Sequence, residues 1–272
     1  MSAALATPAT PAIRLTVPGI VRSEWIKLRT VRSTVWSYAI VVLVSFGLAA
    51  LMASTIYIEP GVPLTSEDQT RFLLMASTFG VFFGQLIVAV LGVLAISGEY
   101  STGMIRSTLT AVPRRLPALW AKVAVLFTAT FVVGVISTVG AFFIASPILA
   151  TKGISADLIG SGIIPSLLGA ALYLAMVSVF SLGIGTILRN SAGGIAAALG
   201  VLLVLPTVIQ VIPATWATDL LPYLLSSAGV NMFGMTSFST ATNEPWVNFL
   251  IALAWVVVSL AGAALLLKRR DA

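Results

Sequence analysis

The stretch LLMASTFGVFFGQLIVAVLGVLAIS, residues 73–97, contains no Asp, Glu, Lys or Arg. About 20 apolar residues in a helix cross the roughly 30 Å hydrocarbon layer of a bilayer. Because lipid offers the backbone no hydrogen-bond partners, an uncharged run of this length is expected to be helical. The stretch therefore predicts a membrane-spanning helix.

Six uncharged apolar stretches of this kind occur along the chain. Their predicted bounds are residues 34–56, 73–97, 123–146, 163–188, 194–213 and 247–267. Hydrophobic residues make up 58% of the 272 positions and charged residues 9%, whereas a soluble domain is about 25% charged. These values exclude a soluble globular protein and predict an all-α integral membrane protein with six transmembrane helices.

The basic residues predict the orientation, because cytoplasmic loops carry an excess of Lys and Arg. With the N-terminus inside, all but Arg71 and Lys152 of the 15 basic residues fall in cytoplasmic segments. We therefore expect both termini in the cytoplasm and a multi-pass location in the cell membrane, a bacterial plasma membrane. Residues 1–18 are rich in Ala, Thr and Pro and lack the apolar core of a signal peptide. They are predicted to be a disordered cytoplasmic tail, followed by a single transmembrane domain over residues 19–272.

Residues 19–33, GIVRSEWIKLRTVRS, precede the first span. Apolar residues share one helical face of this stretch, namely Val21, Trp25 and Leu28. The pattern predicts a basic interfacial helix along the inner leaflet, with Trp25 as an anchor. It is imperfect, because Glu24 lies close to the apolar side. An ordinary basic flank of a membrane span is the alternative.

Residues 98–122, GEYSTGMIRSTLTAVPRRLPALWAK, link the second and third spans inside the cell and are long for a simple connection. Residues 104–112 predict a short amphipathic helix that Pro113 ends, with two arginines just beyond it, where cations are favoured. This basic, partly apolar protrusion suggests a docking surface; a solvated loop is the alternative. Glu99 is the acidic residue of the segment, and we expect it to pair with an arginine or a partner or to be solvated.

Residues 214–246 form the longest predicted outer loop. Its apolar run is too short to cross the bilayer and predicts a short interfacial or re-entrant helix. Three aromatic residues are expected at head-group depth, namely Trp216, Tyr223 and Trp246.

The chain has no His, no Cys and no GxxxxGK[ST] motif. We therefore predict no catalytic activity, no cofactor and no metal, and no ATP binding through a P-loop. The uncharged spans argue against an ion-coupled carrier. A helix break at Pro206 and Gln210 is the alternative that would give a carrier its binding site. A packed proline kink is the commoner explanation. An integral membrane enzyme would need a convergent polar cluster, and Glu99, Tyr100 and Arg106 form only a thin one.

Four segments in order resemble the membrane subunits of ABC-2 type ATP-binding-cassette transporters, especially small actinobacterial permeases. They are SEWIKLRTVRSTVW (Ser23–Trp36), GEYSTGMIRSTLTAVPRRLPALWAK (Gly98–Lys122), LRNSAGGIAAALGVLLVLP (Leu188–Pro206) and LPYLLSSAGVNMF (Leu221–Phe233). The resemblance implies a permease subunit of an exporter, with a connecting helix before the first span and a coupling helix after the second.

The same resemblance implies the partners. Two six-span subunits, identical or related, would enclose a substrate path in the lipid bilayer and pair with two copies of a separate cytosolic ATPase subunit. No nucleic acid partner is expected, and the cargo is not identified. The residues expected to contact the ATPase, in a mechanical role, are Glu99, Met104, Ile105, Arg106, Pro113, Arg114 and Arg115. A secondary carrier or channel that works without an ATPase is the alternative.

Overall fold

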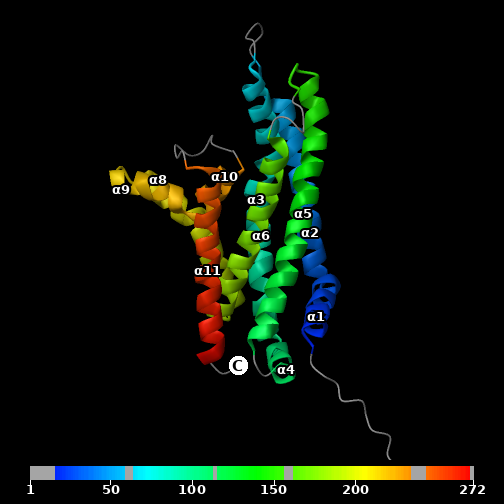
Figure 1. Ribbon diagram of the computed structural model, residues 1–272, viewed down its shortest axis with the longest axis vertical. Coiled ribbons are helices and arrows are strands. Elements are labelled where there is room, and N and C mark those ends of the chain that lie inside the picture. Colours follow the sequence, from blue (N-terminus) through cyan, green and yellow to red (C-terminus); the bar gives the residue numbers. More distant parts are fainter. Residues whose placement is uncertain (1–15, 59–63, 113–114, 156–161, 234–242, 270–272) are drawn as a thin grey trace, which may run out of the picture.

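The computed structural model describes residues 16–58, 64–112, 115–155, 162–233 and 243–269, and the side chains of Arg106 and Leu109 lie outside this description. Within these ranges the chain folds into an elongated helical bundle (Figure 1). Six segments are long and apolar enough to cross a membrane, and each overlaps a predicted span. They are α2 (Arg32–Thr55), α3 (Ser66–Ser101), α5 (Leu116–Ala150), α6 (Ile163–Leu188), Ser191–Val211 and α11 (Pro245–Arg269). The predicted six-span class is confirmed.

Helices α3 and α5 are longer than the apolar stretches that predicted them, with 36 and 35 residues. A capping box starts α3: the Thr65 hydroxyl accepts from the Asp68 amide at 3.1 Å, and the Asp68 carboxylate accepts from the Thr65 amide at 3.2 Å. The C-terminal end of α3 and the N-terminal end of α5 extend beyond the predicted apolar stretches. Glu99 and Lys122 therefore become helical residues at the predicted cytoplasmic end of the bundle.

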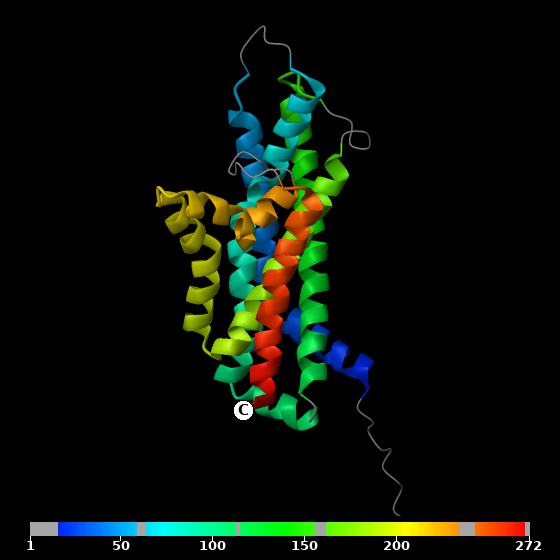
Figure 2. The ribbon, with the colours of Figure 1, turned by 60° about the vertical axis from the view of Figure 1, so that its left-hand side comes forward.

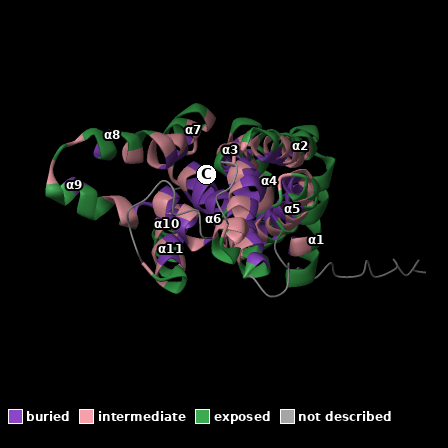
Figure 3. Ribbon diagram, turned by 90° about the horizontal axis from the view of Figure 1, so that it is seen from above, coloured by how far each residue is buried: buried purple, intermediate pink, exposed green. Residues whose placement is uncertain are grey.

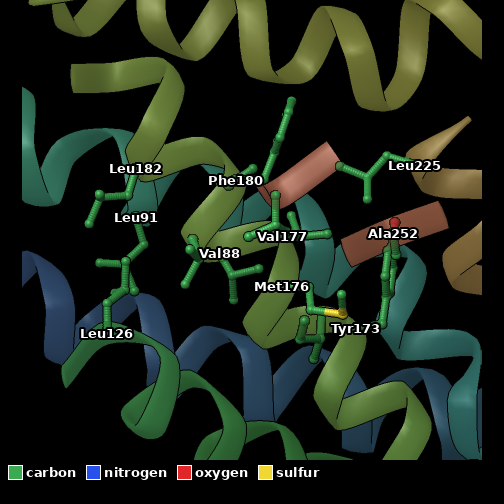
Figure 4. Close-up of a cluster of buried hydrophobic side chains, with 14 of the residues drawn as sticks. Val88, Leu91, Leu126, Tyr173, Met176, Val177, Phe180, Leu182, Leu225 and Ala252 are labelled. Carbon is green, nitrogen blue, oxygen red and sulfur yellow. The ribbon is translucent and has the colours of Figure 1, made fainter. Parts of the chain in front are cut away.

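Helix α6 is the centre of the bundle, where α3, α5 and α11 pack around it (Figure 3). Figure 4 shows the buried side chains at this junction, including Val88 of α3, Leu126 of α5 and Phe180 of α6. Helices α3 and α6 are in tight contact at Gly92, where an added Cβ atom would lie 2.2 Å from the carbonyl oxygen of Ser178. Close approach through small residues is the usual way in which membrane helices pack.

Polar side chains add hydrogen bonds between the spans. Tyr173 of α6 donates to the side-chain oxygen of Gln85 of α3, and both residues are fully buried. Ser259 of α11 donates to the carbonyl oxygen of Phe180 at 2.7 Å. Such bonds between membrane helices are worth about 1 kcal/mol each, so they fix how the helices align more than they stabilise the bundle.

The fifth span is irregular and lies at the edge of the bundle. It consists of α7 (Ser191–Leu199), a π-helical turn (Gly200–Val204) and α8 (Leu205–Val211). The turn ends two residues before Pro206, whose ring nitrogen has no hydrogen to donate, and a local π-helical adjustment is one way in which a membrane helix accommodates such a break. This confirms a proline-associated distortion, and Gln210 is exposed rather than buried in a packed kink.

The stretch after the fifth span, for which one short helix was predicted, holds three short helical segments among its described residues. They are α9 (Thr215–Leu220), a 3-10 turn (Leu221–Tyr223) and α10 (Leu225–Met232). Helices α8 and α9 extend away from the other spans, whereas α10 packs on α11 and α6 (Figures 1 and 2).

Helix α1 (Val17–Thr30) lies at an angle to the spans at the predicted cytoplasmic end (Figure 2). It begins two residues before the predicted start at 19, because the Thr16 hydroxyl caps the amide of Gly19 at 3.3 Å and Pro18 occupies the first turn. Of the predicted tail, residues 1–15 lie outside the described part of the chain. The buried residues of α1 are Ile20 and Glu24, while Trp25 is 41% exposed.

Candidate functional site

Helix α4 (Met104–Ala111) is the short helix that the sequence predicted between the second and third spans. Gly103 turns the chain into it with a φ of 72°, a left-handed conformation that glycine adopts at little cost. The two ends of α4 are held to the bundle, because Ile105 and Val112 are buried. Met104 is 43% exposed. The helix lies at the end of the bundle (Figure 1), with the side chain of Met104 exposed.

Four ionised side chains meet beside α4, and we call them the charge cluster: Glu24 and Lys27 of α1, Glu99 of α3 and Lys122 of α5. The Lys122 ammonium lies 2.5 Å from Glu24 Oε2 and 2.8 Å from Glu99 Oε1. The Lys27 ammonium lies 2.7 Å from Glu24 Oε1 and 3.0 Å from Glu99 Oε1. Each lysine therefore bridges both carboxylates, and the cluster joins three helices.

The charge cluster is mostly shielded from solvent. Glu24, Glu99 and Lys122 are each less than 9% exposed, and Lys27 is partly exposed. Two carboxylates balance two ammonium groups, so the site has no net charge. Burying such ions is costly, and the arrangement is tolerated because each charge has opposite charges beside it. Removing a single member would leave an uncompensated buried charge.

Lys27 also connects the charge cluster to α4, since its ammonium lies 3.4 Å from the Thr108 hydroxyl. Burial acts to lower the pKa of Lys27, but the hydrogen bonds and negative charges of Glu24 and Glu99 outweigh it and raise the pKa above its usual value. A raised pKa in the folded state means that the stabilisation from the charged lysine persists at neutral pH. It is lost only as the pH rises through that folded-state pKa.

The structure places the seven predicted contact residues in different environments. Met104 faces outward, whereas Ile105 and Glu99 are buried. Arg115 starts α5 and donates to the carbonyl oxygen of Leu267 at 3.1 Å, which ties α5 to the end of α11. The backbone of Arg106 lies in α4, but its side chain, together with Pro113 and Arg114, falls outside the described residues.

Sequence reasoning missed three members of the charge cluster, Glu24, Lys27 and Lys122. One signal was present: an acidic residue on the apolar side of an interfacial helix needs a cation opposite it. Lys122 at the inner edge of the third span supplies that cation.

A cavity of about 320 Å³ adjoins the charge cluster and is bounded by residues of α1, α2, α3 and α5 and by Met104 of α4. A second cavity, of about 460 Å³, lies between the outer half of α3 and the fifth span. Three phenylalanines in edge-to-face contact line the second cavity on α3, namely Phe79, Phe82 and Phe83. Pro206 and Gln210 line it on the fifth span.

The six long apolar helices define a multi-pass membrane protein, located in the cell membrane. A family model described as ABC-2 family transporter protein matches residues 20–206, from α1 to the fifth span. The match covers more than half of the chain, which therefore belongs to this family and is the permease subunit of an ABC transporter. Such a subunit works in the membrane with an ATPase subunit. A comparison with curated proteins gives no match.

Proposed function

We propose that this permease is half of an exporter and that α4 is the surface on which a separate cytosolic ATPase subunit docks. The observation that carries the proposal is the construction of α4. Ile105 of α4 and Val112, the residue that caps its C-terminal end, are buried, Met104 is exposed, and Thr108 contacts the charge cluster. A helix held in this way cannot move far without moving the helices to which it is joined.

The charge cluster supplies the connection in this proposal. Lys27 contacts Thr108 of α4, Glu24 of its own helix and Glu99 of α3. Lys122 connects α5 to the same cluster through Glu99. Movement of α4 on ATP binding would thus be shared by α1, α3 and α5. We propose that Glu99 acts as a positioning residue within the cluster, and that Met104, Arg106, Pro113, Arg114 and Arg115 form the contact with the ATPase around a buried Ile105.

We also propose that two copies, identical or related, enclose the substrate path along the fifth span. This span is only 22% buried within one chain, against 78% for α6; α2, at 17%, is the other span with little burial. Its exposed residues include Val204, Val208 and Val211, and α8 and α9 extend away from the bundle (Figure 3). The cavity lined by Phe79 and Pro206 opens beside this span, and its apolar walls suit a hydrophobic or amphipathic cargo.

Replacing Met104 by Asp is expected to break the docking contact, because it sets a charge in place of an exposed apolar side chain at the centre of the surface. Disrupting a hot-spot residue of an interface costs about 2 kcal/mol or more, which weakens the affinity by about tenfold or more. We expect the co-purified ATPase subunit and ATP-driven transport to fall together, with unchanged thermal unfolding of the permease. Lys268→Asp, an exposed change on α11, is the control. Full transport by Met104→Asp, or transport without ATP, would refute this docking role.

Crosslinking can test the pairing of two copies, because the chain has no cysteine. Cysteine placed singly at positions 204, 208 and 211 is expected to give a covalent dimer with a short bis-thiol reagent in membranes for at least one position. Leu43→Cys, on an exposed part of α2 (65% exposed), is the control and should stay monomeric. If the control crosslinks as well as the three test positions, the fifth span is not the interface.

A further inference from the structure

The cavity beside the charge cluster has an apolar part and a polar end. Leu91, Leu94 and Leu126 line the apolar part, and Glu99 and Lys122 line the polar end. Its volume of about 320 Å³ lies at the lower end of the range of about 300–1,000 Å³ that is usual for ligand sites. Leu94 is 36% exposed, so the apolar part opens on the side of α3 that faces lipid. The cavity is thus shaped for an amphipathic molecule that enters from the membrane.

One oxygen of the charge cluster has no hydrogen-bond partner among the described residues. Glu99 Oε1 accepts from both lysines, and both oxygens of Glu24 are paired, but Glu99 Oε2 is buried and unpaired. A buried carboxylate oxygen without a donor is costly. Because Glu99 is only 4% exposed and lines the cavity, the missing donor is expected to come from a molecule in the cavity.

Lys122 also has bonding capacity left. A lysine ammonium has three N–H donors, and within the described residues Lys122 donates to two acceptors, Glu24 and Glu99. The site therefore offers one acceptor and one donor, and its net charge is zero. A molecule with a net charge would leave that charge uncompensated at a buried site. The fitting head group is one that carries both signs, donates a hydrogen bond and also accepts one.

We propose that this cavity binds a phosphatidylethanolamine molecule of the inner leaflet. Its ammonium group donates to Glu99 Oε2, its phosphate accepts from Lys122, and an acyl chain runs past Leu94 into the bilayer. The bound lipid joins α1, α3 and α5 at the point where Lys27 contacts Thr108 of α4. The site goes beyond the proposed docking of the ATPase and does not depend on it.

The test compares two lipids that differ in their donors. Native mass spectrometry of the purified full-length chain, stripped of lipid, would be titrated with phosphatidylethanolamine or phosphatidylcholine of the same acyl chains. Phosphatidylcholine has no N–H to offer Glu99. A charge-assisted hydrogen bond favours the first lipid by about tenfold or more. Equal binding of the two lipids, or preferred binding of anionic phosphatidylglycerol, would overturn the proposal.

A filled cavity gives an independent check. Leu94→Trp adds bulk to the apolar part without touching an ionised group, and should abolish the preference for phosphatidylethanolamine with little change in thermal unfolding. Leu43→Trp, on an exposed part of α2, should keep it. A preference that persists in Leu94→Trp would place the lipid elsewhere. Because these measurements involve neither ATP nor the ATPase subunit, their failure would leave the proposed docking role of α4 untouched.

Discussion

Replacing Lys122 by Met is expected to be the most damaging single change at the predicted cytoplasmic end of the protein. Lys122 lies 2.5 Å from Glu24 and 2.8 Å from Glu99, and all three side chains are buried. The methionine has a similar length but no charge, so both carboxylates would stay in the interior with Lys27 alone to balance them. Breaking a buried ion pair from one side costs about 3–5 kcal/mol. The expected result is a large fall in the thermal-unfolding midpoint of the purified permease and loss of ATP-driven transport.

A second substitution separates the charge balance from the loss of the side chain. Glu24→Gln added to Lys122→Met leaves one carboxylate and one ammonium, Glu99 with Lys27. We expect the double variant to regain part of the lost unfolding midpoint, since the two sites are in direct contact and their effects should not add. Lys268→Met, on an exposed position of α11, should leave both readouts unchanged. A Lys122→Met protein as stable as the Lys268→Met control would mean that these charges are not coupled.

The membrane spans were predictable because the stability of a helix in lipid depends mainly on the residues of that one stretch. A helix in lipid needs about 20 uncharged residues, and this signal lies within each stretch. The short helix α4 was predictable for a similar reason, since Pro113 follows its last turn and apolar residues recur along it. What the local pattern underestimated was length: α3 and α5 continue through Glu99 and Lys122, because each charge has an opposite charge beside it.

The charge cluster was less predictable because its members are far apart in sequence. Glu24 and Lys122 are separated by 98 positions, and Lys27 and Glu99 by 72. Nothing in either segment states which basic residue faces which acid. The sequence showed Glu24 close to the apolar side of its helix and left Glu99 either paired or solvated. Only the packing of α1 on α5 and its ion pair to α3 identify the partners as lysines.

Inside the spans, the hydrogen bond between Tyr173 and Gln85 could likewise not be predicted from the sequence. Both residues lie in stretches that the sequence reads simply as apolar, and both are fully buried. A tyrosine and a glutamine scattered among aliphatic residues do not disturb the hydropathy of a span. Their pairing becomes visible only when α3 and α6 are placed side by side.

The contact between α3 and α6 leads to the second large effect, at Gly92. A leucine there would place its Cβ atom 2.2 Å from the carbonyl oxygen of Ser178, and that oxygen belongs to a helix backbone that cannot yield as a side chain can. Overpacking usually costs about 1–3 kcal/mol and sometimes more. We expect Gly92→Leu to exceed that range, because α6 is the centre of the bundle. The measurement is the yield of monodisperse protein and its thermal-unfolding midpoint. Gly47→Leu on α2, where no atom lies within 4 Å of the added Cβ, is the control.

Alanine at the same two positions gives a sharper test, because it adds only the Cβ atom. In a helix, alanine is favoured over glycine by about 0.5–1 kcal/mol, so Gly47→Ala should raise the unfolding midpoint or leave it unchanged. Gly92→Ala gains the same backbone preference but meets the Ser178 carbonyl, so the midpoint should fall. Opposite signs for one chemical change would show that the approach of the two helices, rather than helix propensity, requires a glycine at position 92. If both variants moved the midpoint upward, α3 and α6 would have room to separate, and this contact would not be what fixes α6 at the centre.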